Sequence, residues 1–159
     1  MELVVAKKPK QVTLVPDPPG VLTSNAGWDT VGEKGLLQDV IGVLQEVGIR
    51  TSIFVDTDLH HVEGALACGT DRVELYTESY AMGYVQDREQ AVAPFVAAGK
   101  LAGELGLGLN AGHDLNLDNL AFFAQHIPNL LEVSIGHALI SDALYLGLEN
   151  TIQLYKRQL

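Results

Sequence analysis

The stretch GLGLNAGHDLN, residues 106–116, joins the two patterns that recur along this sequence. Its first half, GLGLN (106–110), is a short apolar run typical of a buried strand, and its second half brings small residues followed by His113 and Asp114. In sheets of parallel strands, ligands bind where the strands end and the following loops begin. The stretch therefore predicts a parallel strand whose end contributes to a functional site.

Four further segments have the same apolar, β-branched character: QVTLV (11–15), TSIFV (51–55), RVELY (72–76) and LEVSI (131–135). Such runs are typical of parallel strands covered on both faces. Helical spacing and capping residues between them predict helices over 33–47, over 58–67, from Asp87 to 104, from Asn116 or Asp118 to before Pro128, and over much of 139–157. Strand and helix alternate five times, which predicts an α/β fold of five parallel βα units.

The bulk composition limits the classes of protein to consider. The chain has 159 residues, 47% hydrophobic and 19% charged, which predicts one globular domain over 1–159. A net charge of −10 argues against nucleic acid and against an anionic membrane surface as partners. No apolar run reaches membrane-spanning length, the N-terminal residues carry charge, and Cys68 is the one cysteine, so we expect a cytoplasmic protein.

At two strand ends a glycine directly precedes a histidine, in NAGHD (110–114) and in SIGHA (134–138). Glycine lets a ligand approach the backbone closely, and histidine is the side chain best suited to proton transfer near neutral pH. His113 is therefore a candidate for catalysis, and Gly136 with His137 for binding. The alternatives are a solvated loop residue at position 113 and a helix-start histidine at position 137.

Glu74 lies in the middle of RVELY, on the same face as Tyr76. A buried carboxylate is costly unless it is paired or hydrogen-bonded. Glu74 is either a structural ion-pair partner of Arg72 or Arg50, or an active-site acid. The sequence shows no metal-ligand spacing and no phosphate-binding glycine loop, so it predicts neither a metal nor a cofactor.

Six motifs, in this order, resemble the pyridoxine 5′-phosphate synthase family over essentially the whole chain. They are LVPD (14–17), LTSNAGWD (22–29), SIFVD (52–56), VELYTESYA (73–81), LNAGHDLN (109–116) and SIGHALISDAL (134–144). The resemblance implies a (β/α)₈ TIM barrel, of which these residues form strands 4 to 8. It also implies a cytoplasmic, octameric enzyme of vitamin B6 biosynthesis. That family condenses 1-deoxy-D-xylulose 5-phosphate with 3-amino-2-oxopropyl phosphate to pyridoxine 5′-phosphate, phosphate and water.

The same resemblance assigns roles to individual residues. His113 matches the general acid, and Glu74 matches a carboxylate that stabilises cationic transition states. Gly136 and His137 match the residues that bind the phosphate of the amino ketone, and Asp114 matches a contact to the same substrate, here expected through the backbone. Thr23 matches a residue that touches the deoxyxylulose phosphate, with Ser24 as the alternative alignment.

The chain also departs from the family pattern. A (β/α)₈ barrel typically needs ~250 residues. The Asn-x-Asp-His, His-x-Arg and Glu segments of the family's first three strands have no counterpart in these 159 residues. We therefore expect little synthase activity from this polypeptide alone, and association through its unpaired edge strands.

Three alternatives stay open at this point. The five units could form an open doubly wound sheet instead of part of a barrel. The chain could be a non-catalytic fragment that binds phosphate or serves assembly. It could also be an unrelated five-stranded binding domain, which would be favoured if Glu74 and His113 lay at opposite ends of the sheet.

Overall fold

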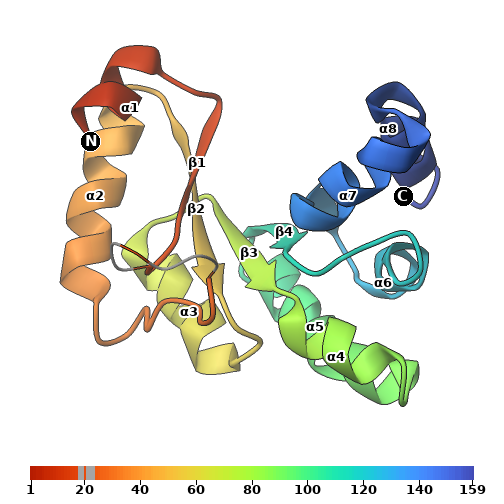
Figure 1. Cartoon of the computed structure of the whole chain (residues 1–159). Coiled ribbons are helices and arrows are strands. Elements are labelled where there is room, and N and C mark those ends of the chain that lie inside the picture. The colour runs from red at the N-terminus through yellow and green to blue at the C-terminus, as the bar shows by residue number, and fades with distance from the viewer. Residues whose placement is uncertain (18–19, 21–23) are drawn as a thin grey trace.

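A single sheet of five parallel strands forms the centre of the molecule (Figure 1). The structure is a computed structural model that describes residues 1–17, 20 and 24–159. The strands are β1 (Gln11–Leu14), β2 (Arg50–Val55), β3 (Arg72–Tyr76), β4 (Gly108–Gly112) and β5 (Leu130–Ser134). Each corresponds to one of the five predicted apolar segments, so the α/β prediction is confirmed.

The strands lie in the sequential order β1-β2-β3-β4-β5, and every neighbouring pair is parallel. A doubly wound sheet would reverse its strand order at a switch point and carry helices on both faces. Here the order does not reverse. One core cluster joins the outward side chains of β2, β3 and β4 to α2, α3, α5 and α6. The arrangement is that of a partial TIM barrel, and the doubly wound alternative is wrong.

Residues 1–17, 20 and 24–159 contain eight helices. They are α1 (Glu2–Lys7), α2 (Lys34–Glu46), α3 (Leu59–Cys68), α4 (Glu78–Tyr84), α5 (Arg88–Glu104), α6 (Leu120–His126), α7 (His137–Leu146) and α8 (Leu148–Lys156). The predicted cap of α5 is present, since the Asp87 side chain accepts a hydrogen bond from the Gln90 backbone N–H. Asp58 caps α3 in the same way through the N–H of His60.

Two helix predictions need correction. The single helix expected over much of 139–157 is two helices, because Gly147 adopts a φ of +80° between α7 and α8. Neither Asn116 nor Asp118 is the N-cap of α6. Asn116 instead accepts N–H groups of a preceding turn, and Asn119 stands at the helix start. The short helices α1 and α4 were not predicted.

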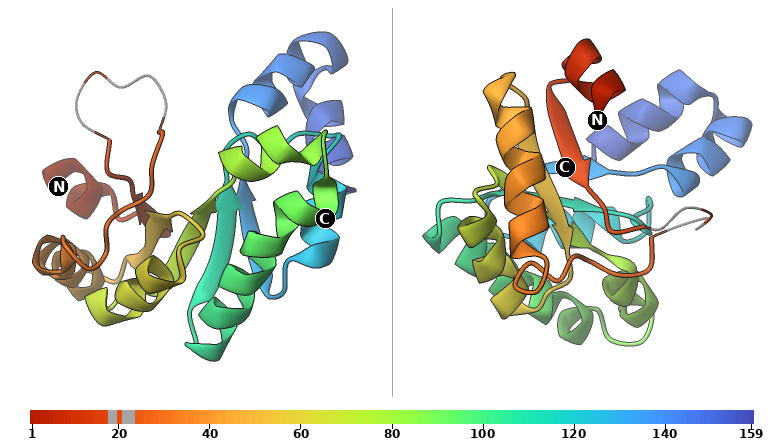
Figure 2. Two further views of the ribbon diagram at one scale, coloured as in Figure 1. Left: turned by 90° about the horizontal axis from the view of Figure 1, so that it is seen from below. Right: turned by 90° about the vertical axis from the view of Figure 1, so that its left-hand side faces the viewer.

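The second face of the sheet is curved and carries polar side chains. Arg50 on β2 contacts Glu132 on β5 at 3.3 Å, although three strand spacings, ~14 Å in a flat sheet, separate those strands. The sheet therefore curves around this face, as in a barrel wall, and we call it the concave face. Two views of the ribbon show the helices outside this curve and the β1 and β5 edges apart (Figure 2).

Among the described residues, no helix combines the length and the apolar character needed to cross a membrane.

Candidate active site

A cleft of about 1060 Å³ opens at the C-terminal ends of β4 and β5. Its wall includes four of the residues singled out from the sequence: His113, Asp114, Gly136 and His137. The first two follow β4, and the last two lie where β5 leads into α7. Two segments more than twenty residues apart are thus brought to one cavity, at the end of the sheet where parallel folds bind ligands.

His113 has an unusual backbone conformation, with a φ of +73°, and Asp114 follows with a φ of +37°. Few residues other than glycine adopt such angles, and they do so where the surrounding structure enforces them. Here the His113 N–H donates to the Ser134 carbonyl at 3.2 Å, and the buried Thr77 hydroxyl lies 2.6 Å from the His113 carbonyl. The bend is held by β5 through Ser134 and by Thr77, the residue that follows β3, so the imidazole has a defined place.

The half-buried imidazole of His113 packs against two aromatic rings. Its centroid lies 5.0 Å from that of Phe54 and 5.5 Å from that of Tyr76, the latter in an edge-to-face arrangement. The Tyr76 hydroxyl donates to Glu78 at 2.8 Å. Burial, and then this acidic partner, raise the pKa of Tyr76 well above its usual range, so its hydroxyl stays protonated.

Glu74 lies on the concave face and is only 5% exposed. One carboxylate oxygen accepts a hydrogen bond from the Thr13 hydroxyl at 3.0 Å. The other oxygen lies 2.5 Å from the position that a Cβ would take at Gly112. Gly112 directly precedes His113, so the Glu74 carboxylate is directed toward the end of β4 at which His113 lies. Glu74 and His113 are therefore not at opposite ends of the sheet, and the condition that favoured an unrelated binding domain is not met. We call Phe54, Glu74, Tyr76 and His113 the histidine cluster.

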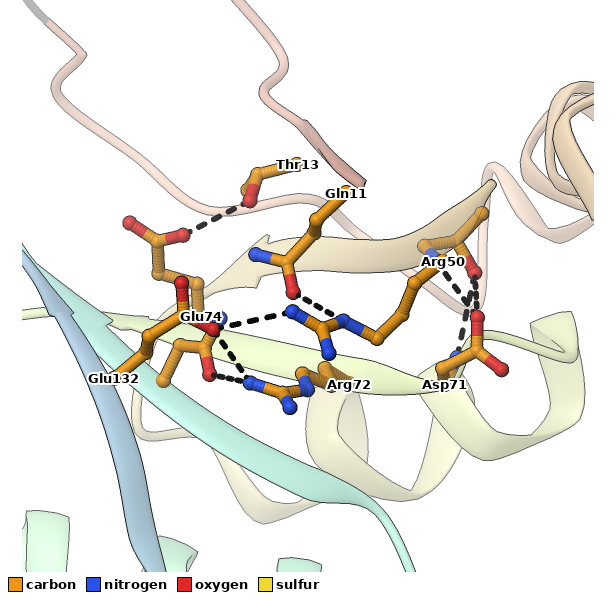
Figure 3. A network of polar contacts seen from close by, with 9 residues as sticks. Gln11, Thr13, Arg50, Asp71, Arg72, Glu74 and Glu132 are labelled. Atoms are coloured by element: carbon orange, nitrogen blue, oxygen red, sulfur yellow. Dashed lines mark hydrogen bonds and ion pairs between the residues drawn. The ribbon is translucent and has the colours of Figure 1, made fainter. Parts of the chain in front are cut away.

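The ion pair of Glu74 with Arg72 or Arg50, left open by the sequence, is not formed among the described residues. Both arginines contact Glu132 on β5, Arg72 at 2.7 Å and Arg50 at 3.3 Å (Figure 3). Arg72 also donates to Asn110 at 2.9 Å, and Arg50 to Gln11 at 2.8 Å. These five residues form what we call the arginine cluster. Sequence reasoning missed Glu132, although its place two residues before Ser134 in a predicted strand was a signal.

The N-terminus of α7 gives the cleft a feature suited to anions. Gly136 is its N-cap residue, and His137 is its first residue; both are exposed. The first N–H groups of a helix have no acceptor within the helix and point outward, where they can bind a phosphate group. Asp114 is exposed across the same cleft, and its carbonyl accepts from the Asn119 side chain at 3.2 Å.

Two site predictions concern the loop after β1. Thr23 lies outside the described residues. Ser24, the alternative alignment, is buried, and its hydroxyl donates to the Asp17 carboxylate at 2.5 Å. Within residues 1–17, 20 and 24–159, no three His, Cys, Asp or Glu side chains converge to hold a metal ion.

Comparison with known proteins identifies the family. The family described as "Pyridoxal phosphate biosynthesis protein PdxJ" matches residues 1–159. The chain belongs to the PdxJ family. The resemblance found in the motifs is therefore confirmed, and an unrelated binding domain is excluded.

The curated relatives of the PdxJ family are named as enzymes. The pyridoxine 5′-phosphate synthase of Flavobacterium johnsoniae is 58% identical over 159 residues, which are 100% of this chain and 67% of that protein. The synthase of Parabacteroides distasonis is 60% identical over 156 residues, 98% of this chain and 66% of the relative. That of Porphyromonas gingivalis is 57% identical over 159 residues, again 100% and 67%. The chain spans about two thirds of the length of these relatives.

Proposed function

We propose that this chain carries one wall of the active site of a pyridoxine 5′-phosphate synthase. The reaction is the condensation of 1-deoxy-D-xylulose 5-phosphate with 3-amino-2-oxopropyl phosphate, giving pyridoxine 5′-phosphate, phosphate and water. The observation that carries the proposal is that one cleft joins His113 to the α7 N-terminus, while the Glu74 carboxylate lies against Gly112, the residue before His113. Family membership and the names of the relatives support it.

In this proposal each residue has a defined task. His113 is the proton donor in the steps that lose water and phosphate, since an imidazole transfers protons near neutral pH. The buried carboxylate of Glu74 stabilises positive charge that develops on the substrate. Gly136 and His137 bind the phosphate of the amino ketone, supported by their place at the α7 N-terminus. Asp114 contacts the same substrate through its backbone, and Thr23 contacts the deoxyxylulose phosphate.

We further propose that the working enzyme is a cytoplasmic homo-oligomer, an octamer as the resemblance implies. An exposed aromatic side chain of α7 supports association, since Tyr145 is 89% exposed. The edge strands β1 and β5 each pair with one described neighbour and are a second surface for association.

The test is an assay for pyridoxine 5′-phosphate with both substrates. One arm uses the 159-residue chain alone, for which we expect no measurable product. The second arm adds, as a separate polypeptide, the third of the Flavobacterium johnsoniae relative that lies outside the match, and we expect product there. His113→Ala should abolish that product, and His60→Ala, at a histidine whose side chain is 87% exposed on α3, is the matched control.

The competing hypothesis is that the chain binds phosphate without catalysing a reaction, and the exposed N-terminus of α7 favours it. It predicts that phosphate binds the chain while neither arm gives product. Product in the first arm would show that these 159 residues suffice.

A further inference from the structure

Two carboxylates of the concave face stand at the same height in the sheet. The strand register pairs Glu74 of β3 with Asn110 of β4, and Asn110 with Glu132 of β5. Arg72 lies two residues before Glu74 on the same strand and the same face, which is ~6.6 Å along the strand. The long side chain of Arg72 therefore has both carboxylates within its reach.

Arg72 nevertheless engages the more distant strand. Its guanidinium lies 2.7 Å from the Glu132 carboxylate and 2.9 Å from the Asn110 side-chain oxygen. Glu74, by contrast, accepts from the neutral Thr13 hydroxyl and forms no ion pair within the described part of the chain. Figure 3 shows the Glu74 carboxylate turned toward Thr13 and the Arg72 guanidinium turned toward Glu132.

Glycines of β4 accommodate these opposite directions. A Cβ at Gly108 would lie 2.7 Å from the Arg72 Cγ, so the arginine side chain crosses β4 over this glycine. A Cβ at Gly112 would lie 2.5 Å from the Glu74 carboxylate, so that side chain is directed toward the end of β4 where His113 follows. The absence of side chains at these two positions separates the cation from the buried carboxylate.

We propose that Glu132 is a positioning residue that holds Arg72 across β4 and so keeps the Glu74 carboxylate unpaired with a protein cation. The inference rests on the role given to Glu74 under the proposed function. A guanidinium bound to Glu74 would neutralise the charge that stabilises a cationic substrate. Arg50, which also contacts Glu132, helps to hold that carboxylate in place.

A double-mutant cycle on the 159-residue chain tests this directly. Arg72→Met and Glu74→Gln are made singly and together, and the unfolding equilibrium constant is measured for each by denaturant titration. The same cycle is repeated in a Glu132→Gln background. We expect the Arg72–Glu74 coupling to be within about twofold of additivity in the native background and about tenfold when Glu132 has lost its charge. A merely structural Glu132 would lower stability without changing this coupling, and equal couplings in both backgrounds would overturn the proposal.

Two control backgrounds refine the test. Glu132→Asp retains the carboxylate and should keep the coupling at its native value. Glu104→Gln removes an exposed charge on α5 and should do the same. A tenfold coupling in either background would mean that loss of any carboxylate redirects Arg72, which contradicts a specific role for Glu132.

If Glu132→Gln does not fold, the pair Arg50→Gln with Glu132→Gln removes one cation together with the carboxylate and leaves the net charge of the face unchanged. A crystal structure of that variant supports the proposal if an Arg72 guanidinium nitrogen lies within about 4 Å of the Glu74 carboxylate. Arg72 remaining on Asn110 alone overturns it. These measurements need no turnover, so they stay distinct from the assay. Absence of product in the two-polypeptide arm would overturn the proposed function, whereas a native-like coupling in the Glu132→Gln background would overturn only this inference.

Discussion

The arginine cluster and the histidine cluster lie on the same concave face and each contains one glutamate, yet they differ in how that charge is satisfied. In the arginine cluster, Glu132 bridges Arg50 and Arg72, and both guanidiniums have further neutral partners. In the histidine cluster, Glu74 has a hydroxyl as its partner, and His113 is surrounded by aromatic rings and an open cleft.

This difference separates a structural role from a chemical one. Charges that are paired within the protein hold strands β2, β3 and β5 together across the curve of the sheet. A charge that has no partner of opposite charge within the protein can form its ion pair with a substrate instead, but burying it unpaired lowers the stability of the folded chain. The comparison therefore predicts that substitutions in the histidine cluster change activity most, whereas substitutions in the arginine cluster change stability most.

The largest expected effect is at His113. Replacement by Asn removes proton transfer but keeps a residue that tolerates the φ of +73°. We expect turnover in the two-polypeptide assay to fall by about 10²–10⁴-fold, the usual contribution of a general acid, with little change in the denaturation midpoint. Native turnover in the His113→Asn variant would show that His113 is not the proton donor.

The second-largest effect is at Gly112, where we expect a substitution to change both stability and turnover. An alanine Cβ there would lie 2.5 Å from the Glu74 carboxylate and 3.1 Å from Ser134. We expect Gly112→Ala to lower the free energy of unfolding by about 1–3 kcal/mol through overpacking, and to reduce turnover because Glu74 moves. Gly42→Ala on α2, where a Cβ meets open space, is the control and should stabilise the helix by about 0.5–1 kcal/mol. Equal effects at both glycines would contradict this packing argument.

The third effect isolates the arginine cluster. Arg72→Met keeps the bulk of the side chain but removes its bonds to Glu132 and Asn110. Because Glu132 is half-exposed, we expect a loss of only about 1 kcal/mol in unfolding free energy. Turnover should remain near the native value, since no cation then competes for Glu74. A large fall in turnover with unchanged stability would reverse the roles of the two clusters.

The sequence predicted the strands well because their signal is local. RVELY (72–76) reads as a strand and is one, with Val73 and Leu75 in the core and Glu74 on the other face. The break at Gly147 was missed because apolar residues continue on both sides of it in a helical pattern. A single glycine does not by itself end a predicted helix, and the packing of α7 on α8 decides the break.

The candidate site was predictable in part. His113 and His137 stand out because glycine and histidine at strand ends are a local pattern, and the family resemblance added their roles. The partner of Glu74 was not predictable, because Thr13 is sixty-one residues away and the contact depends on the curvature of the sheet. The same holds for Glu132 on β5. Its contact with Arg50 on β2 passes over two strands, and its contact with Arg72 on β3 passes over one. Non-local pairs of this kind follow from register and curvature, which residue spacing does not encode.

The smallest expected effect is on the pH dependence of stability and comes from Tyr76 in the histidine cluster. Burial first, and then the Glu78 contact, raise the pKa of Tyr76 above its ordinary value of 10.0, so the folded chain holds this proton more tightly than the unfolded chain. The stabilisation is complete below pH 10 and is lost as the pH rises above it, because the unfolded tyrosine ionises first.

Tyr76→Phe should therefore flatten the fall of stability on the alkaline side, measured as urea midpoints at a series of pH values. Tyr145→Phe, at a side chain that is 89% exposed on α7, is the matched control and should leave the profile unchanged. Because Tyr80 and Tyr155 are also buried tyrosines with raised pKa values, part of the alkaline fall persists in both variants. If Tyr76→Phe and Tyr145→Phe give the same profile, the Tyr76 ring beside His113 is more open to water than its burial implies. The aromatic setting of the histidine cluster would then not exclude solvent from His113, and its difference from the arginine cluster would rest on the Glu74 pairing alone.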